Sequence, residues 1–156
     1  MTTQLSEHFT LEEMCKSETA LRKGIDNIPT DQVIIDNLTD LCMYILEPIR
    51  TNYDTAFTPT SGYRCSALNK TIGSSSKSQH LQGQAADIEV SGVDNFQLAL
   101  WIQDNVPFDQ LILEYYKSGE PSSGWVHVSH VTPSCGKNRG ACVTFDGNTY
   151  QTGLLA

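Results

Sequence analysis

One amphipathic stripe constrains the fold of this chain more than any other feature of its sequence. The segment that begins at Pro29-Thr30-Asp31 and ends at Pro48 carries apolar side chains at steps of four, three and four, namely Ile34, Leu38, Leu41 and Ile45. This spacing predicts a helix, and Asp31 is a residue type that commonly starts one. A lone amphipathic helix has to bury its apolar face against another element. We therefore expect this helix to pack against a sheet built from later segments.

Shorter signals predict the other elements. Thr10-Leu11-Glu12-Glu13 has the form of a capping box, which predicts a short helix. One or two helical turns are expected over residues 67–72, and Asp94 should cap a helix that ends before Pro107. Strands are expected at 86–90, 111–116 and 125–131, and Asp146-Gly147-Asn148 suits a hairpin turn. The pattern predicts an α+β fold, with N-terminal helices packed on a small, largely antiparallel sheet, in a single domain over residues 1–156.

The charge balance and the apolar segments exclude two kinds of partner. Ten Lys and Arg against eighteen Asp and Glu give a net charge of -8, without a basic patch that would hold a phosphate backbone. We therefore expect no nucleic acid partner. No apolar stretch reaches the length of about 18 residues that a membrane span needs, and the first ten residues do not have the form of a signal peptide. We expect a monomer that is made in the cytoplasm and has no membrane span.

The cysteines do not form a disulfide scaffold. There are five of them, an odd number, and they lack the dense regular spacing of small secreted domains. This indicates folding in a reducing cytoplasm. Gly136 and Gly140 would still allow Cys135 and Cys142 to close a loop, so that one pairing stays open.

Histidines and one aspartate form the pattern that carries chemistry. His80 and Asp87 lie seven residues apart, across a glycine and two alanines that allow a tight turn. A catalytic zinc site needs three protein ligands with nitrogen or oxygen donors and an open position for water. His127 is the natural third ligand because strand alternation points it away from its valine neighbours, whereas His130 lies on the opposite face and His8 is far away. On the pattern alone, two loop polar residues and an ordinary strand histidine are an equally good interpretation.

The residues around these three carry a family resemblance. Ser78-x-His80-x-x-Gly83-x-Ala85-x-Asp87, followed by Trp125-x-His127, resembles the signature of zinc D-Ala-D-Ala carboxypeptidases and related phage endolysins, whose fold is shared with the hedgehog signalling domain. Segments 5–10, 46–50 and 61–64 are similar to landmarks of the family's short, single-domain branch. The resemblance implies a hedgehog/D,D-peptidase-like fold and Zn²⁺ held by His80, Asp87 and His127. It also implies a peptidoglycan stem peptide as substrate, cut at its terminal D-Ala-D-Ala bond or at an internal L,D bond.

The resemblance also identifies catalytic candidates. In relatives, the arginine of the Ser-Gly-Tyr-Arg turn holds the substrate, so Arg64 is expected to donate to a terminal carboxylate or to the developing oxyanion; a structural salt bridge is the alternative. Many relatives carry a glutamate three residues before the second histidine ligand, where this chain has Gly124. We expect Glu114 to be the general base, because burial at the end of an apolar strand would raise its pKa. Glu120, in an exposed turn, is the second choice, and an edge-strand surface carboxylate is the other interpretation of Glu114.

Together these features predict a zinc peptidase in which metal-activated water attacks the peptide carbonyl and Glu114 passes the proton to the leaving amine. Cys65 follows Arg64 directly, but no histidine is evidently paired with it, so a covalent route is not expected. Two other hypotheses stay open: a zinc-containing binding module without catalysis, and a structural phage component in which the histidines never meet. A lytic enzyme made in the cytoplasm would act on the cell wall after release, or would be delivered by a phage.

Overall fold

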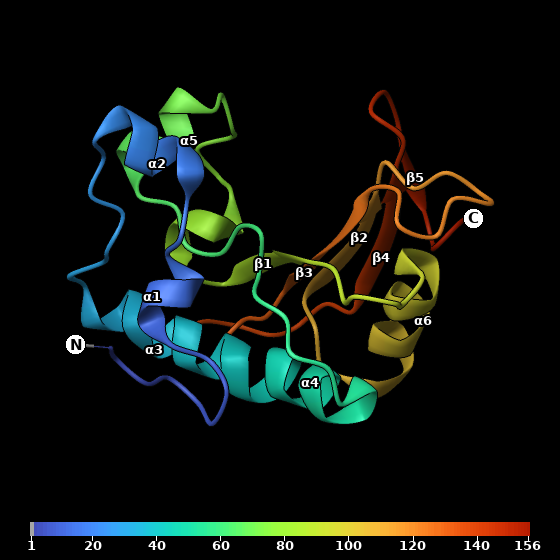
Figure 1. The fold of residues 1–156 in the computed structure, drawn as a ribbon, viewed down its shortest axis with the longest axis horizontal. Coiled ribbons are helices and arrows are strands. Elements are labelled where there is room, and N and C mark those ends of the chain that lie inside the picture. Colours follow the sequence, from blue (N-terminus) through green and yellow to red (C-terminus); the bar gives the residue numbers. More distant parts are fainter. Residues whose placement is uncertain (1) are drawn as a thin grey trace.

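The computed structural model describes residues 2–156. Six α-helices, a π-helical turn (η1), a 3₁₀ turn (η2) and five strands follow one another along these residues (Figure 1). Their bounds, in chain order, are α1 Leu11–Met14, α2 Glu18–Lys23, α3 Gln32–Leu41, η1 Cys42–Leu46, α4 Glu47–Tyr53, α5 Ser66–Thr71, η2 Gln79–Gln82, β1 Ala85–Ile88, α6 Asn95–Asn105, β2 Gln110–Glu114, β3 Trp125–Ser129, β4 Ala141–Phe145 and β5 Tyr150–Thr152.

The strands form a single mixed sheet in the order β1-β3-β2-β4-β5. Three neighbouring pairs are antiparallel, and β2 and β4 are parallel. The predicted α+β class, with a largely antiparallel sheet, is confirmed. α6 lies between β1 and β2 in the chain, where the helix capped by Asp94 was expected.

The two faces of the sheet have different roles. One face is buried in the core, and α6 packs on it against β2 and β3. Its residues are Ala86 and Ile88 from β1, Leu111 and Leu113 from β2, and Val126 and Val128 from β3. Since side chains alternate along a strand, the residues between them point to the opposite face. That second face carries Asp87, Glu114 and His127.

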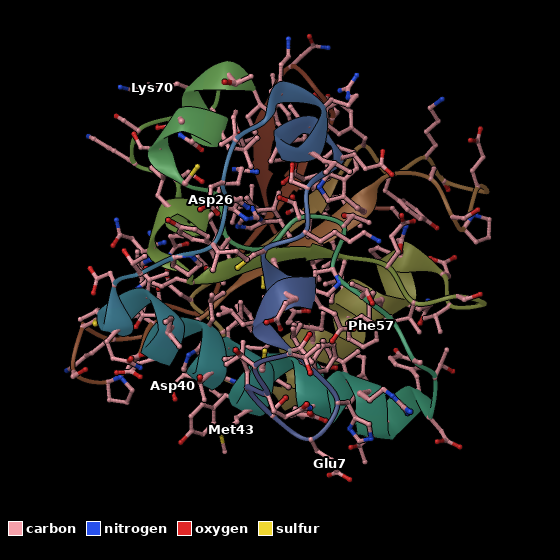
Figure 2. The ribbon with its side chains drawn as sticks, turned by 60° about the vertical axis from the view of Figure 1, so that its left-hand side comes forward. Glu7, Asp26, Asp40, Met43, Phe57 and Lys70 are labelled. Carbon is pink, nitrogen blue, oxygen red and sulfur yellow. The ribbon has the colours of Figure 1, made fainter. Side chains whose placement is uncertain are left out.

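The stripe predicted from the sequence joins the same core. Leu38, Leu41 and Ile45 are fully buried in one cluster with the apolar face of the sheet. The exposed Met43 projects from the outer side of this helix, away from the sheet (Figure 2). The expected end at Pro48 is wrong, since the helical path continues through η1 into α4 as far as Tyr53. Pro48 stands in the first turn of α4, where a missing N–H is tolerated.

Side-chain caps fix where three of the helices begin. The Thr10 hydroxyl accepts from the Glu13 N–H and the Glu13 carboxylate accepts from the Thr10 N–H, so the predicted capping box is present. Asp31 caps α3 and Asp94 caps α6 in the same way. These local signals place helix starts without long-range contacts, which is why the sequence predicted all three.

Two further predictions concern the membrane and the thiols. Within residues 2–156, no helix combines the length and the apolar character that crossing a bilayer requires. The five cysteines are all free thiols in this structure, so the loop that was left open for Cys135 and Cys142 is not closed. Cys15 and Cys42 are buried in the core, where burial raises the pKa of the Cys15 thiol to about 12.

Candidate metal centre

Three side chains from three segments meet on the second face of the sheet. Asp87 of β1 and His127 of β3 are direct cross-strand partners, so their side chains lie on the same face. His80 reaches them from η2, immediately before β1. Asp87 Oδ1 lies 3.0 Å from His127 Nδ1 and 3.5 Å from His80 Nε2. The ligand atoms of all three residues lie within 4.8 Å of one another, so the group could hold a metal ion.

The orientation of His80 is fixed by the backbone around Gly62. His80 Nδ1 lies 2.6 Å from the Gly62 carbonyl oxygen, and because a carbonyl can only accept, Nδ1 carries the proton. The lone pair of Nε2 is therefore free to bind a metal on the Asp87 side. The hydrogen bond from Nδ1 to the Gly62 carbonyl is of the kind that usually orients a metal-binding histidine from outside the metal site. A Cβ at position 62 would overlap the Met14 carbonyl oxygen. Only glycine therefore allows the backbone at position 62 to pack against Met14 while its own carbonyl faces His80.

The electrostatics of the group suit a divalent cation. Burial alone would raise the pKa of Asp87, but the hydrogen bond with His127 Nδ1 and the neighbouring imidazoles outweigh burial and hold this pKa well below its ordinary value. Burial lowers the pKa of His80, which favours the neutral, metal-binding form. Zinc binds nitrogen and oxygen ligands at about 2.0–2.2 Å, so donors around a tetrahedral ion lie about 3.4 Å apart. The separations of 3.0 and 3.5 Å fit that requirement.

Glu114 lies in the neighbouring row of the same face. In the register of the sheet it stands beside Trp125 of β3 and Phe145 of β4, one row along from His127. Burial, followed by the charge of Asp87, raises the pKa of Glu114 above its ordinary value. β2 is central in the sheet, so the interpretation of Glu114 as an edge-strand carboxylate is wrong. Glu120 is exposed and does not line the cavity that contains the three candidate ligands.

Gly124 packs directly on the backbone that carries Glu114. Its φ is +63°, a left-handed conformation that favours glycine. A Cβ at this position would overlap the Glu114 carbonyl oxygen and crowd the carbonyl group of Tyr115. A glutamate therefore cannot occupy position 124 in this structure, and Glu114, from the adjacent strand, brings a carboxylate to the same face.

We expect Gly124→Ala to lower the free energy of unfolding by about 3 kcal/mol. Left-handed backbone costs an L-residue about 1 kcal/mol, and the steric overlap adds about 2 kcal/mol. Urea denaturation would measure the change, with Gly119→Ala as the matched control. Gly119 has a φ of +85° but nothing within 4 Å of its Cβ position, so it should show only the smaller backbone cost. Equal losses in the two variants would contradict the close packing of Gly124 on β2.

Arg64 is held by uncharged oxygen atoms. Its guanidinium donates to Asn69 Oδ1 at 3.2 Å, and to the hydroxyls of Ser61, Ser74 and Ser78 at 3.1 to 3.4 Å. None of the ion pairs formed among residues 2–156 includes Arg64, which argues against the salt-bridge interpretation. Partial burial lowers the pKa of Arg64, but the group stays charged at neutral pH. The guanidinium is thus positioned and free of a carboxylate partner.

One cavity of about 930 Å³ joins these groups. Its lining includes His80, Asp87, His127, Glu114 and Arg64, and it continues to Trp125 of the family motif and to residues that the sequence did not single out: Lys77, Gln79, Tyr115, Arg139 and Tyr150. These residues come from loops and strand ends, whose positions depend on the long-range pairing of the sheet. The sequence around them therefore contains no local pattern that predicts their place in the cavity.

Arg139 belongs to a hydrogen-bonded network under one side of this cavity. The buried Asp109 accepts from Arg139 Nε at 3.0 Å and from Arg139 Nη2 at 2.8 Å. Asp109 also accepts from the Gln79 amide at 2.9 Å, one residue before His80. Hydrogen bonds from Arg139 hold the pKa of Asp109 below its ordinary value, so the pair stays charged. The network ties the segment after β3 to the turn that presents His80.

The remaining candidates lie elsewhere. His8 bonds to Glu47 at 2.7 Å near the N-terminus, and the ring of His130 stacks on Tyr44 at 5.2 Å, so neither joins the candidate metal group. Cys65 is the residue before α5, where its sulfur accepts from the Leu68 N–H at 3.5 Å. It has no hydrogen bond to a histidine, so the covalent route remains unsupported among residues 2–156.

Comparison with known proteins agrees with this geometry. A family model described as peptidase M15 matches residues 7–129, a region that contains His80, Asp87, Glu114 and His127. A search of the curated proteins finds no match. The matched region ends at the last residue of β3, so β4 and β5 lie outside it.

Proposed function

This chain belongs to the peptidase M15 family, and on that premise we propose that it is a zinc metallopeptidase that hydrolyses peptidoglycan stem peptides. One observation carries the proposal: a group of two histidines and one aspartate, suited to a metal ion, shares a cavity with a carboxylate of raised pKa. This combination is what a metal-assisted hydrolysis requires.

The side chains have distinct roles in the proposed reaction. His80, Asp87 and His127 would hold zinc, which lowers the pKa of a bound water and polarises a carbonyl. Glu114 accepts a proton from the attacking water at its carboxylate and passes it to the nitrogen of the leaving amine. Arg64 donates to an oxygen of the substrate, either the carbonyl oxygen as negative charge develops or a nearby carboxylate. No side chain of the protein has to form a covalent bond with the substrate.

The form of the cleft supports cleavage of an internal bond. A second cavity of about 620 Å³, lined by residues of α2 and α5 and by segment 58–64, shares Arg64 and Ile72 with the cavity of the candidate metal centre. A peptide could therefore extend on both sides of Arg64. A carboxypeptidase needs room for only one or two residues beyond the cleaved bond. We therefore favour an endopeptidase over removal of the terminal D-Ala.

A binding module without catalysis is the second candidate, and the position of Glu114 counts against it. Such a module has no need for a partly buried carboxylate beside the candidate metal group, since an unpaired buried charge is costly. In the same proposal, the protein reaches the cell wall after its release from the cytoplasm or through delivery by a phage.

The test is digestion of purified peptidoglycan by the metal-free and the zinc-restored protein. We expect a chelator to abolish cleavage and one equivalent of zinc to restore it, with new amino groups measured by chemical labelling and the cut bond located by mass spectrometry. Internal fragments would support the endopeptidase, and released D-Ala the carboxypeptidase. Stoichiometric zinc without cleavage of any stem peptide would favour the binding module, and a protein that binds no zinc would contradict both.

A further inference from the structure

Aromatic side chains form a continuous surface beside the candidate metal centre. Trp125, Phe145 and Tyr150 occupy the same row of the sheet as Glu114, on β3, β4 and β5. The ring of Tyr150 stacks on that of Phe145 with centroids 4.3 Å apart. Tyr115 bridges the two residues on either side of Glu114, with its ring 5.1 Å from Trp125 and 5.5 Å from Phe145. We call these four residues the aromatic platform.

Tyr115 joins the platform through an unusual backbone conformation. Its φ is +58°, in the left-handed region that non-glycine residues rarely adopt. Regular alternation after Glu114 would point the Tyr115 side chain to the buried face of the sheet. The left-handed turn instead brings its ring against two residues of the opposite face. Strain of this kind persists where the surrounding structure enforces it and is concentrated at functional sites.

The platform is open to solvent and continuous with the candidate metal centre. Tyr150 is 67% exposed and Tyr115 is 44% exposed, although large aromatic side chains usually bury most of their surface. Both line the same cavity as His80 and Asp87. Phe145 and Tyr150 stand on the β4–β5 hairpin, which rises at one end of the sheet (Figure 1). That hairpin lies outside the region matched by the family model.

The chemistry of the cavity selects a neutral ring as the occupant. Arg139 is neutralised by Asp109, which leaves Arg64 and Lys77 against Asp87 and Glu114. A bound zinc ion would add two positive charges, so a second cation is disfavoured here. The faces of aromatic rings carry partial negative charge, which disfavours an anion. A ring with apolar C–H faces and hydroxyl groups at its edge matches flat aromatic faces flanked by polar side chains.

We propose that the aromatic platform binds a pyranose ring of the glycan strand to which the stem peptide is attached. This inference rests on the proposed function, because it names the part of the substrate that lies beyond the cleaved peptide. Its consequence is a preference for stem peptides that still carry their sugar. Because the platform and Glu114 share one row of the sheet, the sugar would be held beside the reacting bond, which places that bond near the glycan end of the stem.

The test compares a disaccharide-linked stem peptide with the same peptide free of sugar. We expect the wild-type protein to have a higher kcat/KM for the linked substrate. Tyr150→Ala should reduce the ratio of the two kcat/KM values on the order of tenfold. This size is taken by analogy with nucleic-acid bases that stack on an aromatic side chain, where replacing that side chain by alanine removes one stacking contact. Tyr150→Phe keeps the ring and should keep the ratio. Tyr44→Ala is the matched control, since Tyr44 is also exposed but lies outside the cavity.

Several outcomes would overturn the inference. An equal kcat/KM for linked and free peptide in the wild type would do so, as would a Tyr150→Ala variant that loses both activities in the same proportion. A preference that depends on a free amine in the stem peptide, lost when that amine is acetylated, would identify a cation as the occupant instead.

A binding measurement separates this inference from the proposed function. The free disaccharide should bind to wild-type protein in a calorimetric titration and should bind at least several-fold more weakly to Tyr150→Ala. Because this titration involves no cleavage, sugar binding by a protein that cuts no peptide would sustain the platform while contradicting the peptidase. Cleavage of stem peptides by a protein that does not bind the disaccharide would support the peptidase and contradict the platform.

Discussion

Replacing Glu114 by glutamine should reduce kcat for stem-peptide hydrolysis by about 10²- to 10⁴-fold, the range of a lost general base. Glutamine has nearly the same shape and keeps a hydrogen-bonding oxygen, but it cannot accept the proton of the attacking water. Glu114 is not among the three candidate ligands, so the variant should bind one zinc ion as the wild type does. Its thermal unfolding should change little or shift upward, because burial disfavours the charged carboxylate that is removed.

Glu120→Gln is the matched control for this prediction. Glu120 is exposed in the loop between β2 and β3, and it does not line the cavity. Its substitution should leave kcat, KM and zinc content at wild-type values. Full activity in Glu114→Gln, or a large loss in Glu120→Gln, would refute the assignment of the base. Zinc content measured by atomic emission on both variants distinguishes loss of the base from loss of the metal.

Replacing His80 by alanine should remove both the zinc ion and the hydrolysis that depends on it. The metal contributes several kcal/mol of charge stabilisation in reactions of this kind, so we expect a loss on the order of a thousandfold or more. The effect should also appear without any substrate. Zinc at a thousandfold excess over Kd stabilises a folded protein by about 4 kcal/mol, which raises Tm by roughly 10 °C for a chain of this size.

Differential scanning calorimetry with and without zinc measures this stabilisation. The zinc-dependent rise in Tm should be present in the wild type and absent in His80→Ala. His130→Ala is the control, because His130 is also a buried histidine at the end of the same sheet but stacks on Tyr44, outside the candidate metal group. The control should lose some stability from its packing while keeping the zinc-dependent rise. If His80→Ala kept that rise, these three residues would not be the zinc ligands.

The elements that could be predicted from the sequence are those with local signals. Caps at Thr10, Asp31 and Asp94 and the apolar stripe from Ile34 to Ile45 act within a few residues, so they are readable in a single chain. The end of the long helix was not predictable in this way. Pro48 usually marks a stop, but here a π-helical turn places it at the start of a new α-helical segment.

The candidate site shows the same division. His80 and Asp87 are close in sequence, and strand alternation makes His127 a candidate, but the pattern left an ordinary structural interpretation equally good. The family resemblance favoured these three residues as ligands. The partners that orient them could not be found this way. Gly62 contacts His80 across 18 residues, and Arg139 reaches Asp109 across 30 residues. Such contacts depend on the register of the whole sheet, which no local pattern in the sequence specifies.

The reason for Gly124 became visible only with the fold. In the sequence, this glycine marks the absence of an expected carboxylate. In the structure, it is the position that lets the loop before β3 lie against the end of β2, where Glu114 stands. The glycine at position 124 therefore does not leave the site without a carboxylate, because Glu114 stands at the end of the adjacent strand.

The parallel pairing of β2 with β4 has a consequence for how the chain acquires its shape during synthesis. β2 is central in the finished sheet, yet its partner β4 begins only at Ala141, after a segment that also contains Arg139. Until the ribosome has released that segment, β2 presents an open edge of unpaired N–H and C=O groups, which invites association with other chains. β4 and β5 thus cover this edge of β2, and nascent chains that stall after residue 129 would be the aggregation-prone species.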